Sequence, residues 1–190
     1  MPPQDGGSRR VTIKGVTAQS VALRDVNVNN FVGTESNPGL QKIISSCLSE
    51  MEAGTVSDIF FQQLQHFNRA PSERNLKIKL SDAGKNDAYY DYAIEAKESF
   101  AKFFEVVARH PSGQRVLLAA FSHAYSVFRE KIQPNIEYIT FDHQAEIFEK
   151  DVVLFLSHNL TGMPGFYGRN EALGLLYFLA DNCFIEYANV

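Results

Sequence analysis

Apolar side chains recur at intervals of three and four residues over two long stretches of the chain. In the first stretch they are Tyr89, Ala93, Ala96, Phe100, Phe103 and Val107. In the second they are Leu118, Phe121, Tyr125, Phe128 and Ile132, before Pro134. This spacing places each set on one face of an α-helix. Because a short connection at His110-Pro111-Ser112 separates the two stretches, the pattern predicts an antiparallel hairpin of long helices with matching aromatic faces.

Shorter versions of the same pattern predict helices before and after this hairpin. Asn37 can cap a helix whose first turn contains Pro38. Its apolar face would consist of Ile43, Ile44, Cys47, Leu48 and Met51. A second helix is expected between residues 55 and 70, where a capping-box-like start precedes an apolar face. Two more are expected over residues 143–157 and 171–180.

Two segments are predicted to be extended. Residues 1–36 are rich in Val, Asn, Thr and Gly, and apolar residues recur there every five positions: Val11, Val16, Val21, Val26 and Phe31, with Ile13, Ala18, Leu23 and Val28 at the same interval. This period favours a square β-helical coil and resembles the pentapeptide-repeat pattern, with Val in place of a small residue; a pair of alternating strands is the alternative. CFIEY, at 183–187, has the composition of a short strand, and the N-terminal segment is its expected mate.

These predictions describe a mainly α protein, a helical bundle built on a long antiparallel helix hairpin with a short N-terminal β region and a C-terminal strand. The chain would divide into a repeat segment over 1–36, a helical pair over 37–71 and a helical domain over 72–190. One β coil cannot bury its own two ends, because repeat units gain stability by stacking on neighbours. Contacts with a partner or a second copy of the chain are therefore expected at Val16, Val21, Val26, Phe31, Phe166, Tyr167 and Ile185.

Composition and charge argue against a nucleic-acid-binding, secreted or membrane protein. A net charge of -4 with scattered basic residues argues against direct contact with nucleic acid. Cys47 and Cys183 lie far apart in apolar surroundings, which favours two reduced thiols. The N-terminus lacks the apolar run of a signal peptide, and no apolar stretch reaches the length of a membrane span. We therefore expect a cytoplasmic protein that makes no membrane contact.

Candidate catalytic groups form no familiar motif. The five histidines include no HExxH pair, and the glycine-containing loop from Gly162 to Gly168 lacks the Lys-Ser/Thr ending of a phosphate-binding loop. We therefore predict no catalytic residue, no metal and no cofactor. One alternative is a small metal-free hydrolase in which Asp142, His143 and this loop converge in one pocket. Another is a small-molecule sensor with an aromatic cavity inside the helical body.

The ending GLLYFLADNCFIEY, residues 174–187, resembles the closing motif of the C-terminal domain found in ABC-three-component systems. The matching positions are Gly174, Tyr177, Leu179, Asn182, Cys183 and Ile185. Two upstream stretches fit the same family in outline: LKIKLSDAGKNDAYYDYAIEAKESFAKFF and HPSGQRVLLAAFSHAYSVFREKIQPNI. The resemblance covers about residues 72–187.

This resemblance implies a role in bacterial antiviral defence, as part of an anti-phage conflict system. Such domains are coupled to an ABC-type ATPase, related to DNA-repair and chromosome-maintenance ATPases, and to a small middle protein of the same operon. In many members an effector such as a nuclease or protease precedes the domain, and residues 1–36 are too short to be one. The resemblance therefore implies a non-enzymatic adaptor, whose N-terminal repeat oligomerises or tethers the complex.

Overall fold

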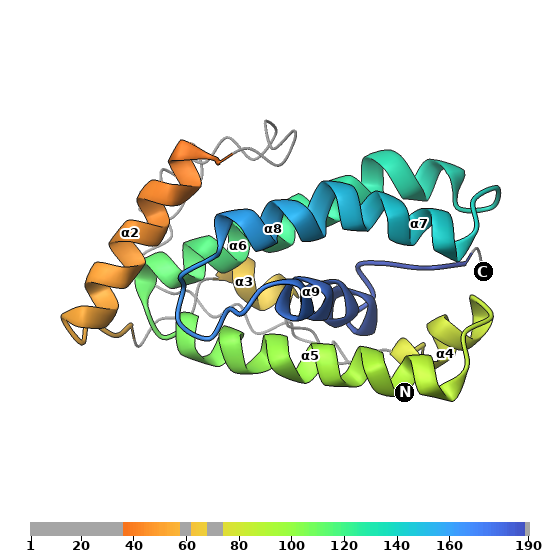
Figure 1. The fold of residues 1–190 in the computed structure, drawn as a ribbon, viewed down its shortest axis with the longest axis horizontal. Helices are drawn as coiled ribbons and strands as arrows, with labels where there is room; N and C mark the ends of the chain where they lie inside the picture. Colours follow the sequence, from red (N-terminus) through yellow and green to blue (C-terminus); the bar gives the residue numbers. More distant parts are fainter. Residues whose placement is uncertain (1–35, 58–61, 68–73, 189–190) are drawn as a thin grey trace, which may run out of the picture.

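The computed structural model describes residues 36–57, 62–67 and 74–188, and this part of the chain is mainly helical (Figure 1). The α-helices, labelled as in Figure 1, are α2 (Pro38–Glu52), α3 (Gln62–Phe67), α4 (Leu76–Asp82), α5 (Asp87–Val107), α6 (Pro111–Val127), α7 (Phe141–Phe148), α8 (Leu154–Asn159) and α9 (Arg169–Asp181). The predicted N-terminal β region, including Val16, Val21, Val26 and Phe31, lies outside the described residues. No described helix is long and apolar enough to cross a membrane.

Helices α5 and α9 form the centre of the fold. The side chain of Asn86 caps α5 by accepting a hydrogen bond from the backbone N–H of Tyr89 at 3.0 Å. Ala93 and Ala96 are buried on the face that meets α9. A Cβ atom built on Gly174 of α9 would lie 2.0 Å from the carbonyl oxygen of Ala96, so the two helices touch backbone to backbone. The glycine of the C-terminal motif is therefore required by this close approach.

The predicted hairpin of α5 and α6 is formed only in part. The two helices follow each other through a short connection, and Phe100 of α5 contacts Phe121 of α6 with ring centroids 5.7 Å apart. However, Phe178 of α9 stacks on Phe121 at 5.5 Å and on Phe104 of α5 at 6.1 Å. Helix α9 is buried on several sides. It therefore covers much of the apolar face of α5 that was predicted to pack against α6. Figure 1 shows α9 between α5 and the helices on the opposite side.

The other long helices contain π-helical turns. Helix α6 continues through a π-helical turn at Phe128–Ile132 and a short 3₁₀ turn at Gln133–Asn135. The helical stretch therefore ends one residue after Pro134, where the sequence predicted its end. The helix predicted over 143–157 consists of α7, a π-helical turn at Glu149–Val153 and α8.

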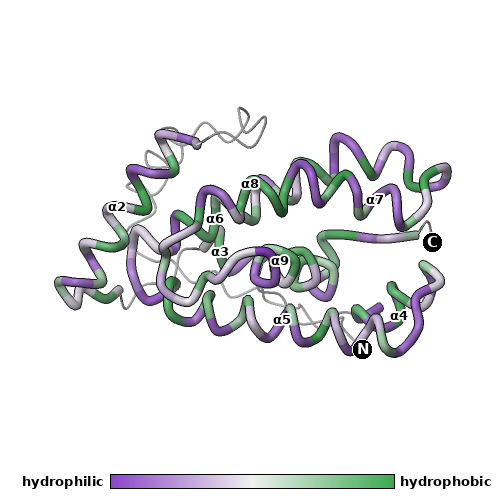
Figure 2. Tube along the Cα trace, in the orientation of Figure 1, coloured by the Kyte–Doolittle hydropathy of each residue, from purple (hydrophilic) through white to green (hydrophobic). Residues whose placement is uncertain are grey.

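Along α5 the hydropathy alternates, as expected for a helix with one face toward the core (Figure 2).

Helix α2 is attached to the rest of the fold at both of its ends. The predicted cap is confirmed, since the side chain of Asn37 accepts from the backbone N–H of Leu40 at 2.9 Å. The backbone N–H of Asn37 donates to Asn159 Oδ1 at 2.9 Å. At the other end, Glu50 accepts from the backbone N–H and the hydroxyl of Ser112, at 2.8 and 2.6 Å. Between these ends, burial raises the pKa of the Cys47 thiol to about 11, and this cysteine forms no disulfide.

The predicted C-terminal strand is wrong, because residues 183–188 follow α9 without forming a strand with any described residue. Ile185 is fully buried and Tyr187 is 5% exposed. Their carbonyl oxygens accept hydrogen bonds from two side chains, Lys79 Nζ at 3.1 Å and Gln144 Nε2 at 3.0 Å, instead of from a neighbouring strand. The strand-like composition of this C-terminal segment therefore reflects burial of its side chains and not strand pairing.

Candidate functional site

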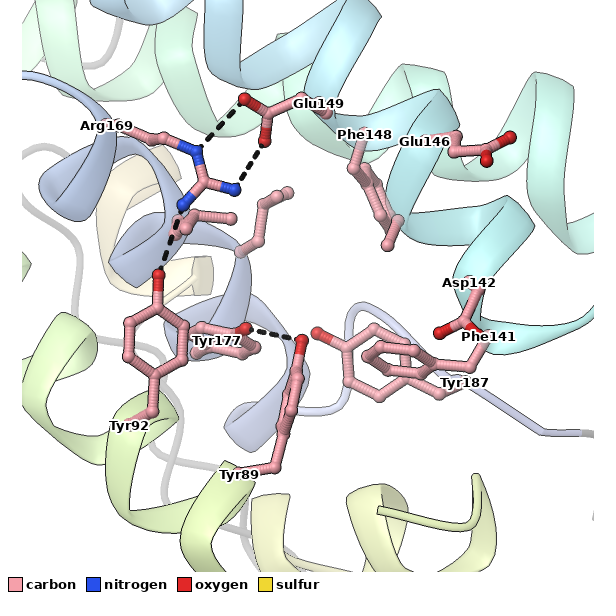
Figure 3. Close-up of a pocket in the computed structure, with 13 residues that line it drawn as sticks. Tyr89, Tyr92, Phe141, Asp142, Glu146, Phe148, Glu149, Arg169, Tyr177 and Tyr187 are labelled. Atoms are coloured by element: carbon pink, nitrogen blue, oxygen red, sulfur yellow. Dashed lines mark hydrogen bonds and ion pairs between the residues drawn. The ribbon is translucent and has the colours of Figure 1, made fainter.

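A cleft with a volume of about 380 Å³ lies between α5, α7, α9 and the C-terminal segment (Figure 3). Its aromatic walls are formed by Tyr89, Tyr92, Phe141, Phe148, Tyr177 and Tyr187. Leu173 and Leu176 of α9 add aliphatic surface. A concave site with aromatic walls and a few polar groups is the usual form of a small-molecule site. We refer to it below as the tyrosine cleft.

The aromatic walls are held by contacts with one another. The hydroxyls of Tyr89 and Tyr177 are 3.1 Å apart and share a hydrogen bond. The ring of Tyr89 meets Phe141 edge to face, with centroids 5.5 Å apart, and Phe141 contacts Tyr187 at 5.1 Å. One residue from each of α5, α7, α9 and the C-terminal segment therefore joins a single aromatic cluster, so the shape of the cleft depends on all four elements.

Lys79 of α4 fixes the segment that carries Tyr187. Its side chain is fully buried, and Nζ donates to the carbonyl of Ala180 at 2.6 Å and to that of Ile185 at 3.1 Å. The same ammonium lies 2.8 Å from Glu186 Oε1. A buried ammonium is tolerated when its N–H groups are bonded and a counter-charge is near. Lys79 thereby binds the end of α9 and the C-terminal segment to α4.

The charged side chains at the cleft are paired within the chain. Arg169 donates to both carboxylate oxygens of Glu149 at 3.0 Å and to the hydroxyl of Tyr92 at 3.2 Å (Figure 3). Lys85 Nζ lies 2.7 Å from Asp142 and 4.4 Å from the centre of the Phe141 ring. Such pairing leaves the cleft with little unbalanced charge.

Two of the cleft tyrosines keep their protons under ordinary conditions. Burial raises the pKa of Tyr177, and the neighbouring Tyr187 and Tyr89 raise it further. Burial also raises the pKa of Tyr187, with added contributions from Tyr89 and Glu186. Both hydroxyls are therefore neutral at pH 7 and can donate hydrogen bonds.

The structure does not bring together the groups of the hydrolase hypothesis. Asp142 lines the tyrosine cleft, whereas the imidazole of His143 is 57% exposed and lies 3.4 Å from Glu146. The loop Gly162–Gly168 lies near the other end of α5, where a Cβ on Gly165 would be 3.5 Å from Cα of Phe103. At 1.5 Å per residue, the beginning of α5 at Asp87 is about 24 Å from Phe103. The tyrosine cleft is lined by Asp142 but by neither His143 nor any of residues 162–168.

The predicted partner contacts within the described residues occupy different environments. Phe166 is 6% exposed and packs against Phe103 with ring centroids 5.2 Å apart. Tyr167 is 89% exposed, the largest exposure among the described large hydrophobic residues. Ile185 is fully buried. Of these three, only Tyr167 is exposed, and a partner contact at any of them stays a prediction, which for Phe166 and Ile185 requires that they be uncovered.

Several residues of the site were not singled out from the sequence. The alternative of a sensor with an aromatic cavity named no lining residues and stays a prediction, and Lys79, Glu149 and Arg169 were not proposed as site residues. The spacing of Tyr89 and Tyr92 on one helix was the available signal, since residues three apart share a face. No cluster of three or more His, Cys, Asp or Glu suited to a metal ion occurs among the described residues.

Residues 75–187 match the family described as C-terminal domain 9 of the ABC-three component (ABC-3C) systems. The match covers more than half of the chain. The chain belongs to this family. The matched region begins at the cap of α4 and ends at Tyr187, so the ABC-3C domain contains every wall of the tyrosine cleft, while α2 lies outside it. No curated protein and no solved structure matched the chain.

Proposed function

We propose that this chain is a non-enzymatic adaptor subunit of a bacterial antiviral defence complex. Its ABC-3C domain would couple to an ABC-type ATPase and to the small middle protein of the same operon. The observation that carries the proposal is the family match over residues 75–187. This region comprises the helical body from α4 to the C-terminal segment.

Helix α2 supports the adaptor role because it connects the N-terminal segment to this domain in a defined position. It is pinned through Asn37 at its beginning and through Glu50 at its end. Gln41 adds a hydrogen bond to the carbonyl of Asn159 at 3.0 Å. A helix held at both ends fixes where the preceding residues leave the domain. We propose that residues 1–36 oligomerise or tether the complex from that point.

We also propose Tyr167 as a contact to the ATPase or the middle protein. The loop that carries it is anchored by the burial of Phe166 and by Glu171, which is 2% exposed. Glu171 accepts from the backbone N–H of Tyr167 at 3.0 Å and from the hydroxyl of Ser99 at 2.6 Å. An exposed tyrosine on a well-anchored loop binds with little loss of conformational entropy, and tyrosine is enriched at interface hot spots.

Co-purification tests the coupling. The chain would be expressed with the ATPase and middle protein encoded beside it, and the complex measured by size-exclusion chromatography with light scattering. We expect a complex of defined mass, and at least a tenfold weaker affinity after Tyr167→Ala, as for a hot-spot residue. Tyr138→Ala is the matched control, since Tyr138 is also 83% exposed. Separate elution of all three proteins would contradict the adaptor proposal, and equal effects of the two variants would contradict the role of Tyr167.

Truncation tests the proposed role of the N-terminal segment. The full chain and a chain starting at residue 36 would be compared by the same light-scattering measurement. We expect a larger particle only for the full chain, while helicity and the unfolding midpoint stay similar because α2 keeps its contacts. The same number of copies per particle for both chains, alone and in the complex, would contradict oligomerisation through this segment.

A further inference from the structure

The polar groups of the tyrosine cleft are nearly all satisfied by the chain itself. Four charged side chains line it, and each has a partner of opposite sign or a polar neighbour in the described structure: Asp142 with Lys85, Glu146 with His143, and Glu149 with Arg169. Tyr89 and Tyr177 bond to each other, and Tyr92 accepts from Arg169. Asp142 and Glu149 are therefore paired with cations of the chain, and Glu146, whose side chain is 78% exposed, has an imidazole as its neighbour.

The hydroxyl of Tyr187 differs from these groups. Its residue is 5% exposed, and the hydroxyl forms no hydrogen bond with any described residue. In Figure 3 it is directed toward the cleft, beside the hydroxyls of Tyr89 and Tyr177. The hydroxyl is not one of the fully buried side-chain atoms that lack a partner, so water reaches it from the cleft. A hydrogen-bond acceptor on a bound molecule would take the place of that water.

We propose that the tyrosine cleft binds an uncharged aromatic small molecule that accepts a hydrogen bond from Tyr187. The ring of the ligand would pack on the tyrosine and phenylalanine walls, and a carbonyl oxygen or ring nitrogen would face the Tyr187 hydroxyl. A volume of about 380 Å³ is at the small end of the range of ligand sites, which suits a molecule of one or two rings. This inference goes beyond the adaptor role and does not depend on it.

The charged side chains around the cleft favour a neutral ligand over an anion or a cation. An anion would lie beside the carboxylates of Asp142, Glu146 and Glu149. A cation would have to displace Lys85 from Asp142 or Arg169 from Glu149, at 2.7 and 3.0 Å, because the remaining carboxylate, Glu146, is 78% exposed and screened by water. Both alternatives cost electrostatic energy in a partly buried site, whereas a neutral ring requires only apolar contact and one hydrogen bond.

Three probes of the same size separate these cases: benzamide, benzoate and benzamidinium, which differ in charge and retain one aromatic ring. Their affinities for the full chain would be measured at pH 7 by ligand-observed NMR titration. We expect benzamide to bind at least fivefold more tightly than the two charged probes. Tyr187→Phe is expected to weaken benzamide binding about fivefold, the effect of one lost hydrogen bond. Tyr138→Phe, outside the cleft, should leave the affinity unchanged.

A second variant tests the location without disturbing the core. Ala145 lines the cleft from an exposed position on α7, so Ala145→Leu reduces the cleft while the buried faces stay intact. It should abolish benzamide binding at unchanged helicity. The proposal is overturned if benzamidinium or benzoate binds most tightly, if none of the probes binds at millimolar concentration, or if Tyr187→Phe and Ala145→Leu bind benzamide as the original chain does.

Discussion

The two sides of α9 are held in place by different interactions. Where it crosses α5, Gly174 lies against the Ala96 backbone, and the surrounding contacts are apolar and close. Toward the tyrosine cleft, α9 is held by the ion pair of Arg169 with Glu149 and by the hydrogen bond between Tyr177 and Tyr89. The C-terminal end of α9 is held by Asp181, which bonds to Lys97 of α5 and to the backbone of Leu76 in α4. The crossing of α9 and α5 has no room for an added methyl group. On the cleft side, a substitution can remove one polar contact and leave the others in place. Stability should therefore be concentrated at the crossing, and adjustable binding at the cleft.

The largest effect is expected from Gly174→Ala. The new methyl group would meet the carbonyl of Ala96 at 2.0 Å, and backbone cannot move aside as a flexible side chain can. We expect a loss of about 3 kcal/mol in the free energy of unfolding, measured by urea denaturation. Gly54→Ala is the control, since its φ of +66° is unfavourable for alanine but no atom lies within 4 Å of the new Cβ. It should cost about 1 kcal/mol, and equal losses would contradict the account of the crossing.

A smaller effect is expected from Lys79→Met, which removes the buried ammonium that holds the C-terminal segment. Two carbonyls and Glu186 lose their partner, so we expect a loss of about 2 kcal/mol in unfolding free energy. Lys77→Met, on the same helix, is the control, because Lys77 forms an exposed pair with Asp87 at 3.0 Å. That change should leave the unfolding free energy unchanged within the error of the measurement, because water screens an exposed pair. Similar losses for both lysines would show that the buried contacts of Lys79 add no stability.

Asp181 gives the C-terminal end of α9 a dependence on pH. Burial raises the pKa of this carboxyl, but hydrogen bonds from Lys97 at 2.7 Å and from the backbone of Leu76 at 2.9 Å lower it below its ordinary value of 3.8 overall. Its contribution is therefore present above pH 3.8 and is lost as the pH falls through the lower folded-state value. We expect Asp181→Asn to cost about 1.5 kcal/mol at pH 7.

The pH profile provides the check on Asp181. The difference in unfolding free energy between the original chain and Asp181→Asn should be constant from pH 7 to 5 and should shrink below pH 4. A difference that grows on acidification would mean that the carboxyl is destabilising in its charged form, contrary to its two hydrogen bonds.

The smallest effect is expected from Arg169→Gln. Arg169 is 58% exposed and bonds to Glu149, so water screens much of the pair. We expect a loss of about 0.5 kcal/mol at low salt, decreasing at 1 M salt, by urea denaturation. A loss as large as that of Gly174→Ala would remove the distinction between the two sides of α9.

The sequence allowed the main helices to be predicted because their signals are local. The cap at Asn37, the face of α5 around Phe100 and the end of the helix near Pro134 each depend on neighbours within a few residues. Helix α4 was missed because LKIKLSD is short and alternates apolar residues with lysines. Its helical signal, Leu76 and Leu80 four residues apart, extends over little more than one turn.

The errors arose where long-range contacts decide the structure. The partners of Lys79 lie more than 100 positions away, so no local pattern shows that this lysine is buried. The C-terminal segment has the alternation of a strand because Ile185 and Tyr187 face the core, while side chains satisfy its carbonyls. The close packing of α9 on α5 depends on Gly174. The sequence showed this glycine as part of the family motif, but its contact with the Ala96 backbone lies on another helix and could not be predicted.

Hydrogen–deuterium exchange of the full chain tests the contrast between the two sides of α9 most directly. We predict that amides in 93–103 and 174–180 exchange only by global unfolding, at the free energy obtained from urea denaturation. Amides in 141–148 and 184–188 should exchange faster through local opening, and should be slowed when benzamide is present. Equal protection of all four segments, or faster exchange at the crossing than at the cleft, would contradict the account.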